Sequence, residues 1–578
     1  MTFGAGLQHE PTWSPDGQAL AYTSDRDGNL DIWIQSMSDP NPVRLTSSPS
    51  HDWQPDWSAD GQWIAFRSER DGGGLWIVPA RGGLERRITT SGYRPRWSPD
   101  GTKILFLSSA LRTSAARHVF VVGLDGQPPQ PVRPEMTREL RSLNVAWHPD
   151  GRVSFSGMHP TTGRLFVTAS LTGTETSSSM CLPDVDRRVK DGGVTLGGFM
   201  WAPSGRYLYF EGRSNGVRNL WRVTVDPMTM AWTGGPDRLT TGAGHDTDMT
   251  ISRDGTKLAF TARSEQTRVW SFPFDSVSGT LTGRAEPLTP EGVNEQGPDI
   301  LSLSNGNKVV YRVSLGDHTE LRELSFVDRR ERVLIGGKAR TRTNARWSPD
   351  GARLAYDVLG TPAEPAAKKY TAILGRDGVE QVVTTPGSSW NTTGWSPDGQ
   401  SLLGSCRQAT GPRLAICLMP LSAAPHAERA IRMITANPDM SLYQAQFSPD
   451  RRWVLFLAIP ALEGGISTIN IVSPSGGAWT SITDGRSYED KPRWAPDGRA
   501  VYFVSNRDGL LNVWGRRFDP ASGQPVGPMF RVTAFDTLRK ILSPDSIGAI
   551  EIAVAADRLV LPITEASASI WALDGIDR

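Results

Sequence analysis

Short apolar runs separated by turn residues recur along the whole 578-residue chain, as in Leu20–Tyr22, Ile64–Phe66 and Val501–Phe503. Runs this short, rich in aromatic and β-branched residues, are typical of buried strands. No long amphipathic pattern interrupts them, and residues 134–143 suggest at most a short turn of helix. The pattern therefore predicts an all-β protein.

Two kinds of turn frame each apolar run. The motif Trp-Ser-Pro-Asp-Gly, or a close variant, precedes it. Pro fixes φ, the Asp side chain bonds back to its own backbone, and Gly accepts a positive φ. After the run comes a second turn, such as Asp27-Gly28, and Asp-Gly between apolar runs is a strong hairpin signal. A third strand with a Trp and a fourth segment, often Arg-Leu-Thr, complete a four-stranded antiparallel unit.

The motif occurs in twelve copies spaced 40 to 60 residues apart. Four short strands per repeat, with no helices between repeats, describe the blades of a β-propeller. The position of the motif's Trp is occupied in turn by Trp13, Trp57, Trp97, Trp147, Trp201, Ile251, Leu303, Trp347, Trp395, Phe447, Trp494 and Val554.

Twelve blades exceed the four to eight of a usual ring. Copies five and six, at residues 226–229, 250–258 and 269–273, resemble copies eleven and twelve, at residues 519–523, 550–559 and 570–574, in order and spacing. A duplicated six-blade unit explains this resemblance. We predict two tandem six-bladed propellers, residues 1–290 and 291–578. A seven-plus-five split is disfavoured, because the duplication would then cross the boundary.

The blade motifs, including Ser24–Trp33 and Arg44–Thr46, resemble those of the TolB-like family of Pro-Asp-repeat propellers. The resemblance covers nearly the whole chain and implies a TolB-like fold. It implies little about function, because propellers host many roles. TolB's own N-terminal α/β domain has no counterpart here. Similar tandem propellers form the C-terminal part of larger bacterial proteins with a kinase or winged-helix domain, and a start within a repeat fits that sensor group.

Charge and hydropathy exclude some partners. The 62 basic and 61 acidic residues leave a net charge of +1 without a basic run, so we expect no nucleic-acid partner. No apolar stretch approaches the ~20 residues of a membrane helix, so we expect no membrane insertion of this segment. No signal peptide is visible, although the family resemblance favours a periplasmic or otherwise extracytoplasmic location. We expect a monomer.

Three cysteines are too few for a disulfide framework, and none forms a C-x-x-C metal pair. Cys406 and Cys417 flank a predicted hairpin turn at 408–412, so a cross-strand disulfide is geometrically possible. Two reduced, buried thiols are the favoured alternative, because free Cys is commonly buried.

Catalytic motifs are missing from the sequence. It has no G-x-S-x-G elbow, no P-loop and no kinase motif set, and His9-Glu10 lacks the second His of a zinc-peptidase motif. Residues 25–31 resemble the front of a calcium loop, but the distal Glu is absent and a hairpin turn is favoured. The 20 Trp favour packing between blades over ligand stacking. We predict no enzyme, no catalytic residue, no cofactor and no metal.

Acidic and imidazole side chains gather two to five residues before the turn motif. In a propeller the innermost strand lines the central channel, so these residues predict a binding site at the channel mouth, preferably of the first propeller. Solvated loop residues that cap turns are the alternative. The candidate residues are His9, Glu10, His51, Asp52, His245, Asp246, Asp248, Glu489 and Asp490.

The function predicted from these observations is a non-enzymatic TolB-like scaffold that binds protein or peptide partners, as the sensor part of a larger signalling protein. One alternative is a propeller accessory to a peptidase or hydrolase of the dipeptidyl-peptidase type, with the catalytic domain absent. Calcium-dependent, lactonase-like catalysis is a third. The sequence names neither the ligand, the compartment nor the parent architecture.

Overall fold

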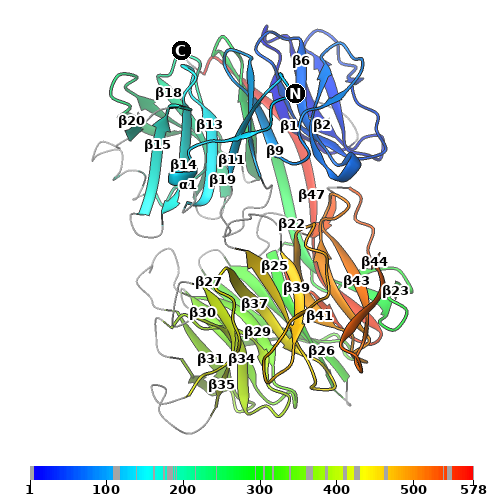
Figure 1. The fold of residues 1–578 in the computed structure, drawn as a ribbon. Coiled ribbons are helices and arrows are strands. Elements are labelled where there is room, and N and C mark those ends of the chain that lie inside the picture. Colours follow the sequence, from blue (N-terminus) through cyan, green and yellow to red (C-terminus); the bar gives the residue numbers. More distant parts are fainter. Residues whose placement is uncertain are drawn as a thin grey trace. The chain divides into compact units, whose positions relative to one another are not determined.

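The computed structural model has an all-β fold, which confirms the prediction (Figure 1). Helical residues among those described are confined to α1 (Pro134–Thr137), the short 3-10 turn η1 (Arg70–Gly72) and residues 187 and 189. The structure describes residues 6–108, 118–137, 140–159, 163–172, 176–178, 187, 189, 192–214, 217–242, 244–292, 294–303, 306–315, 318–337, 340–359, 369–384, 388–407, 413–421, 430–460, 467–537, 539–542 and 550–576.

The chain forms two compact units. Unit 1 contains Met1–Glu265, Asp536–Arg539 and Ala566–Arg578, and unit 2 contains Gln266–Phe535 and Lys540–Glu565. Within the described residues, each unit has five four-stranded antiparallel sheets in which neighbouring strands follow chain order, as the hairpin signals predict.

The five sheets of unit 1 are β1 (Gln8–Trp13), β2 (Ala19–Ser24), β3 (Asp31–Ser36) and β4 (Val43–Arg44); β5 (Asp52–Trp57), β6 (Trp63–Ser68), β7 (Gly74–Pro79) and β8 (Arg86–Arg87); β9 (Tyr93–Trp97), β10 (Lys103–Leu107), β11 (Val119–Gly123) and β12 (Gln130–Pro131); β13 (Arg141–Trp147), β14 (Val153–His159), β15 (Gly163–Ala169) and β16 (Thr176–Ser178); and β17 (Thr195–Trp201), β18 (Tyr207–Ser214), β19 (Val217–Val225) and β20 (Trp232–Arg238).

The five sheets of unit 2 are β25 (Asn294–Leu303), β26 (Gly306–Leu315), β27 (His318–Ser325) and β28 (Glu331–Ile335); β29 (Thr341–Trp347), β30 (Leu354–Leu359), β31 (Tyr370–Leu374) and β32 (Glu380–Val382); β33 (Asn391–Trp395), β34 (Ser401–Arg407), β35 (Leu414–Pro420) and β36 (Arg432–Thr435); β37 (Met440–Phe447), β38 (Val454–Pro460), β39 (Thr468–Val472) and β40 (Thr480–Ser481); and β41 (Glu489–Trp494), β42 (Ala500–Ser505), β43 (Asn512–Asp519) and β44 (Gln524–Arg531).

An eleventh sheet has seven strands: β21 (His245–Ile251), β22 (Lys257–Asp275), β23 (Thr280–Leu281), β24 (Glu286–Pro287), β45 (Lys540–Leu542), β46 (Ala553–Val554) and β47 (Arg558–Asp574). The division between the units falls inside β22 and β47, so both units contain part of each strand. The predicted count of two six-bladed rings, with a boundary near residue 290, stays a prediction.

The turn chemistry predicted for Trp-Ser-Pro-Asp-Gly is present. The Asp16 carboxylate accepts hydrogen bonds from the Ser14 hydroxyl (2.5 Å) and the Gln18 N–H (3.0 Å), and Gly17 has a φ of 65°. The Ser14 hydroxyl in turn accepts the Ala19 N–H (2.9 Å). The same Ser–Asp bond recurs at residues 58 and 60, 98 and 100, 252 and 254, 348 and 350, 396 and 398, and 448 and 450. The predicted turn at 408–412 and part of that at 303–306 lie outside the described residues.

The hydrophobic core lies between neighbouring sheets. In one cluster, Ala65, Leu75 and Ile77 of one sheet pack against Trp97 and Phe106 of the next. The predicted packing role of the motif Trp is confirmed at Trp13, Trp97, Trp201, Trp395 and Trp494, all of which are buried. These contacts place the first strands of neighbouring sheets side by side.

Most first strands contain a β-bulge with a residue of positive φ. Such a conformation is uncommon outside glycine, and it persists where the surrounding structure over-determines it, often at functional sites. A bulge also re-aims a side chain. Each of these residues stands three positions before the Trp, Phe or Ile of the turn motif; they are Glu10, Gln54, Arg94 and Asp248 in unit 1 and Asn344, Gln444 and Lys491 in unit 2.

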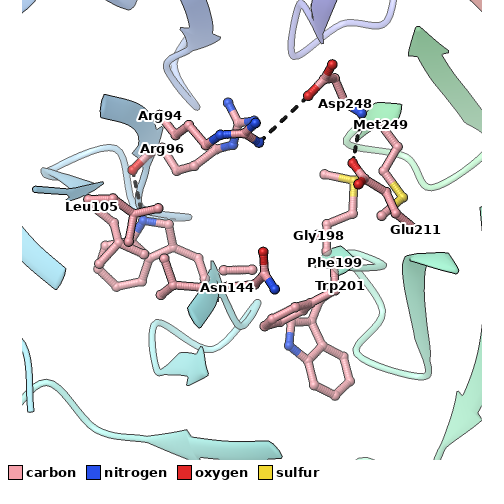
Figure 2. A pocket seen from close by; sticks show the side chains of 15 residues that line it. Arg94, Arg96, Leu105, Asn144, Gly198, Phe199, Trp201, Glu211, Asp248 and Met249 are labelled. Atoms are coloured by element: carbon pink, nitrogen blue, oxygen red, sulfur yellow. Dashed lines mark hydrogen bonds and ion pairs between the residues drawn. The ribbon is translucent and has the colours of Figure 1, made fainter. Parts of the chain in front are cut away.

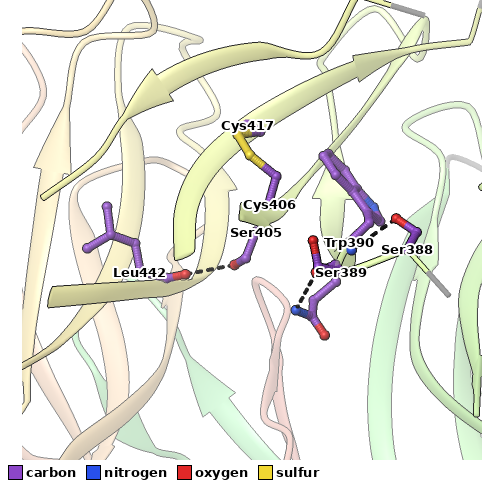
Figure 3. Close-up of a disulfide and its surroundings, with 8 residues drawn as sticks. Ser388, Ser389, Trp390, Ser405, Cys406, Cys417 and Leu442 are labelled. Atoms are coloured by element: carbon purple, nitrogen blue, oxygen red, sulfur yellow. Dashed lines mark hydrogen bonds between the residues drawn. A yellow bond between two sulfur atoms is a disulfide. The ribbon is translucent and has the colours of Figure 1, made fainter. Parts of the chain in front are cut away.

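A disulfide joins Cys406 of β34 and Cys417 of β35, whose Cα atoms are 6.0 Å apart (Figure 3). Cys406 pairs with Ala415 and Cys417 with Gly404, so the two are diagonal neighbours in the register. The structure thus contains the bond that the sequence left as the less favoured alternative. The third cysteine, Cys181, lies outside the described residues.

This disulfide is expected to contribute about 2–3 kcal/mol to the stability of unit 2, because it closes a loop of 11 residues in the unfolded chain. Replacing both cysteines by alanine should lower the free energy of unfolding, measured in denaturant, by that amount. The variant should also be insensitive to a reducing agent that destabilises the parent chain. Equal stability of the parent chain with and without reductant would contradict the prediction.

Candidate functional site

A cavity of about 170 Å³ lies in unit 1, lined mainly by residues of the first strands β9, β13, β17 and β21 (Figure 2). Arg94 and Arg96 lie on one side of it, and Glu211 and Asp248 lie on the other. Asn144 and apolar residues such as Phe199 complete the lining. The lining of the cavity therefore contains basic, acidic and apolar side chains.

The basic side comes from alternate residues of β9. Arg94 occupies the bulge, where its backbone N–H donates to Gln54 Oε1 (2.7 Å), and its Nη1 lies 3.7 Å from Asp248 Oδ1. Arg96 Nη1 lies 3.3 Å from Asp56 Oδ1. Burial raises the pKa of Asp56 to about 6, although Arg96 and the Trp97 N–H oppose that rise. Two guanidinium groups are thus held side by side by acids of the same unit.

The acidic side is held by backbone and side-chain contacts. The buried Glu211, on β18, accepts the Asp248 N–H at Oε1 (3.0 Å), and its Oε2 lies 3.8 Å from Arg218 Nη1. Asp248 occupies the bulge of β21. This pair of carboxylates opposite two guanidinium groups suits a ligand that carries both a positive and a negative group.

Glu10, in the bulge of β1, holds a carboxylate that is 12% exposed and lies close to this site. Its Oε2 accepts the Gln54 N–H (3.0 Å) and the Thr23 hydroxyl (3.3 Å), and lies 3.4 Å from His9 Nδ1. Burial by itself would raise the pKa of Glu10. His9, Arg94 and the Gln54 N–H outweigh burial and lower that pKa to about 2, so the group is anionic at neutral pH.

Bulge residues are linked from one sheet to the next. The Gln54 N–H donates to Glu10, the Arg94 N–H donates to Gln54, and the Asp248 N–H donates to Glu211. Each bond joins a backbone donor of one first strand to a side chain of the preceding sheet. The side chains around the cavity are therefore oriented by a shared network.

The two other predicted histidines have a common structural role. His51 Nδ1 accepts the Leu30 N–H (3.3 Å), and His245 Nδ1 accepts the Arg218 N–H (3.3 Å). Each bond joins the start of one sheet to the third strand of the preceding sheet. Both imidazoles thus form hydrogen bonds between neighbouring sheets. Their role in ligand binding stays a prediction.

The acids beside them lie in the interior. The side chain of Asp52 has no exposed surface and contacts Arg70 Nη2 at 2.7 Å, and burial raises its pKa. Asp246 Oδ2 accepts a hydrogen bond from Asn219 Nδ2 (3.3 Å). In unit 2, Glu489 is buried against Arg507, and Asp490 accepts the Tyr488 hydroxyl (2.7 Å). Among the nine predicted residues, Glu10 and Asp248 are brought together around Arg94; a binding role of the others stays a prediction.

Sequence reasoning missed Arg94, Arg96, Asn144 and Glu211. A signal for two of them was present, because Arg94 and Asn144 stand three positions before Trp97 and Trp147, as Glu10 does before Trp13. This constant spacing of three positions identifies the bulge position in the sequence. Arg96 and Glu211 carry no comparable mark, since a single charged residue in a strand has many uses.

Residues 25–31, which resemble the front of a calcium loop in sequence, make protein contacts in the structure. Asp25 Oδ1 accepts the Leu7 N–H (2.7 Å), and Asp31 Oδ2 contacts Arg44 Nη2 at 2.6 Å. No group of three or more His, Cys, Asp or Glu side chains in the described part of the chain is arranged to hold a metal ion. No helix among those residues is long and apolar enough to span a bilayer.

A known protein family resembles the first part of the chain. Residues 3–177 match the family model described as the TolB beta propeller domain. The matched segment includes Glu10, Arg94 and Asn144 of the candidate site.

Two curated relatives match parts of the chain. The uncharacterized protein Atu1656 of Agrobacterium fabrum is 39% identical over 182 residues, which are 31% of this chain and 56% of that protein. Dipeptidyl-peptidase 5 of Porphyromonas gingivalis is 23% identical over 140 residues, 22% of this chain and 19% of that protein. The chain thus spans about half of the first relative and a fifth of the second.

Solved structures similar to this chain include the tricorn protease, at 12% identity and a TM-score of 0.32, covering 95% of this chain and 54% of that one. A protein described as TolB from Agrobacterium tumefaciens has 15% identity and a TM-score of 0.25, covering 57% of this chain and 82% of that one.

Proposed function

We propose that this TolB-like chain is a binding scaffold without chemistry of its own, and that unit 1 holds a peptide segment of a protein partner in the cavity between Arg94 and Asp248. The observation that carries the proposal is the pair of guanidinium groups facing the pair of carboxylates. The family resemblance supports an extracytoplasmic location for this role.

The size of the cavity favours one residue of a peptide over a cofactor. Pockets for drug-sized ligands and cofactors typically measure about 300–1,000 Å³. A cavity of about 150 Å³ accepts a benzene-sized molecule. The 170 Å³ of this cavity matches a single side chain or chain terminus inserted from a larger partner.

The charge arrangement favours a polypeptide as well. A peptide terminus or a charged side chain brings a carboxylate or an ammonium, and the adjoining peptide groups supply donors and acceptors. Arg94 and Arg96 would hold an acidic group, whereas Asp248 and Glu211 would hold a basic one. Charge-assisted hydrogen bonds of this kind are about twice as strong as neutral ones.

Peptides selected from a random hexapeptide library against the purified chain test this proposal. Binding of the selected peptides to Arg94→Gln and Asp248→Asn should be weaker by about tenfold or more, because each variant removes one charge-assisted contact. Calorimetry measures the affinity. Asp557→Asn, an exposed acid of unit 2, is the matched control and should bind like the parent chain. Unchanged affinity in both cavity variants would overturn the proposal.

A second candidate function is an accessory propeller of a peptidase. The 140-residue similarity to dipeptidyl-peptidase 5 supports it. In this case the chain should capture a serine peptidase that a fluorophosphonate probe labels. Capture of partners that the probe does not label would favour the binding-scaffold function over the accessory role.

A further inference from the structure

A pocket of about 650 Å³ in unit 2 is lined by aromatic and charged side chains, and it shares no lining residue with the cavity of unit 1. Trp270 and Phe272 of β22 and Ile563 of β47 are buried. The ring of Phe535 meets that of Phe272 edge-on, with the centroids 6.0 Å apart. The other lining residues are Arg284, Ala285, Glu286, Pro287 and Lys540. A volume in this range is typical of sites for small molecules.

The pocket lies beside a position at which its sheet differs from four others. In β22, Trp270 pairs with Pro287 of β24. In the other four sheets the tryptophan of the third strand pairs with an arginine of the fourth: Trp33 with Arg44, Trp76 with Arg87, Trp221 with Arg238 and Trp514 with Arg531. Arg44 Nε donates to the Thr46 carbonyl (2.9 Å), so this side chain lies along its own strand. Pro287 has no such side chain, and it lines the pocket instead.

The backbone around Pro287 is nevertheless held as in the other sheets. The Leu288 N–H donates to the Val269 carbonyl (2.8 Å), and the Val269 N–H donates to the Thr289 hydroxyl (3.1 Å). After Arg531, the same two bonds join residues 532 and 533 to Val513, each at 2.9 Å. An arginine therefore fits the backbone at residue 287.

Lys540 places an ammonium group beside the aromatic rings. Its Nζ lies 4.3 Å from the centroid of the Trp270 ring and 3.0 Å from Glu565 Oε1. Glu565 is shared with Arg268, whose Nη2 lies 2.5 Å from Oε2. The side chain of Lys540 is 52% exposed, so its ammonium group is accessible to a ligand.

Arg284 and Glu286 supply the other charges of the lining. Glu286 Oε1 lies 2.5 Å from Arg329 Nη2, so this carboxylate is already paired. Arg284 is exposed and forms no ion pair with any residue that the structure describes. The nine lining residues thus include two cations and one acid, which gives them a net charge of +1.

We propose that this pocket binds a small aromatic carboxylate. The ring of the ligand would pack against Trp270, Phe272 and Phe535, because aromatic rings favour edge-on and offset contacts with one another. Its carboxylate would accept charge-assisted hydrogen bonds from Arg284 and Lys540. A single negative charge matches the net charge of the lining better than a phosphate dianion does. The site takes a small molecule in unit 2, so it is separate from the peptide site proposed for unit 1.

The probe is 4-fluorocinnamate, added to the full chain and followed by its fluorine NMR resonance. Ligands of this size usually bind with a Kd of about 1 mM or lower. The neutral amide, 4-fluorocinnamamide, keeps the ring and should bind at least about fivefold more weakly, because it lacks the charge-assisted contacts. Equal affinity of the acid and the amide would overturn the proposal, and so would a parent chain that does not bind the acid at about 10 mM.

Two variants locate the probe in the pocket. Arg284→Gln removes one cation and should weaken binding by about threefold or more, because Lys540 remains. Pro287→Arg introduces the residue that the other four sheets have at this position. Its side chain should fill part of the pocket and weaken binding at least about tenfold. Circular dichroism checks that both variants remain folded.

Two further variants serve as controls for the same titration. Arg432→Gln changes an exposed arginine of β36 in another sheet of unit 2, and it should bind the probe like the parent chain. Arg94→Gln, in the cavity of unit 1, should also leave the affinity unchanged. If Arg284→Gln and Pro287→Arg bind like the parent chain, or if Arg94→Gln loses the affinity instead, the probe does not bind in this pocket and the proposal fails.

Discussion

Replacing Glu551 with alanine is expected to lower the free energy of unfolding of unit 2 by about 3–5 kcal/mol. Glu551 is buried, and its Oε2 lies 2.9 Å from Arg346 Nη2 and also contacts Arg493 Nη2. Its Oε1 lies 3.5 Å from Lys491 Nζ. Alanine would leave these cations buried without that carboxylate, and an uncompensated buried charge is costly.

The pKa of Glu551 points to a similar magnitude. Burial would raise the pKa, but Arg346, Lys491 and Arg493 together lower it from 4.5 to about 2. A lowering of this size corresponds to about 3 kcal/mol of stability. Because the folded pKa lies below the unfolded one, this stability is present above about pH 4.5 and is lost as the pH falls towards 2.

Denaturant unfolding at pH 7 measures the loss, with the transitions of the two units fitted separately. The matched control is Glu286→Ala, because Glu286 and its partner Arg329 are 55% and 53% exposed. That variant should lose about 0–1 kcal/mol, as exposed pairs do. Equal losses in the two variants would show that the buried network contributes little.

The contribution of Glu489 to the stability of unit 2 is expected to have the opposite pH dependence. Burial raises its pKa from 4.5 to about 7, against the opposing effects of the Thr483 hydrogen bond and Arg507. Here the folded pKa lies above the unfolded one. The contribution of Glu489 is therefore fully present below about pH 4.5 and is lost as the pH rises through about 7. The total loss is about 3 kcal/mol.

The measurement compares Glu489→Gln with the parent chain at several pH values between 4 and 9. Glutamine cannot ionise, so the variant should lack this decline, and its stability relative to the parent chain should increase by about 3 kcal/mol across the range. Glu286→Gln, at the exposed pair, serves as the control and should follow the parent chain. If the free energies of unfolding of Glu489→Gln and the parent chain differed by the same amount at every pH, the raised pKa of Glu489 would be refuted.

Much of the fold follows from the sequence alone. The Ser14–Asp16 bond, the positive φ of Gly17 and the Asp27-Gly28 hairpin are consequences of neighbouring residues, and such local chemistry repeats wherever the motif does. The alternation of turns and short apolar runs therefore determined the four-stranded sheets. Part of the site could also be predicted from the sequence, because Glu10 and Asp248 stand at the same number of residues before the turn motif.

Only the tertiary structure decided which charged groups meet. Arg94 and Asp248 are separated by most of unit 1, and Arg346 and Glu551 lie 205 residues apart in sequence. Their contacts depend on the bulges and on the packing of successive sheets, which no local pattern encodes. For the same reason His51 and Asp52 make other contacts than Glu10. They stand six and five positions before Trp57, whereas Glu10 occupies the bulge three positions before Trp13.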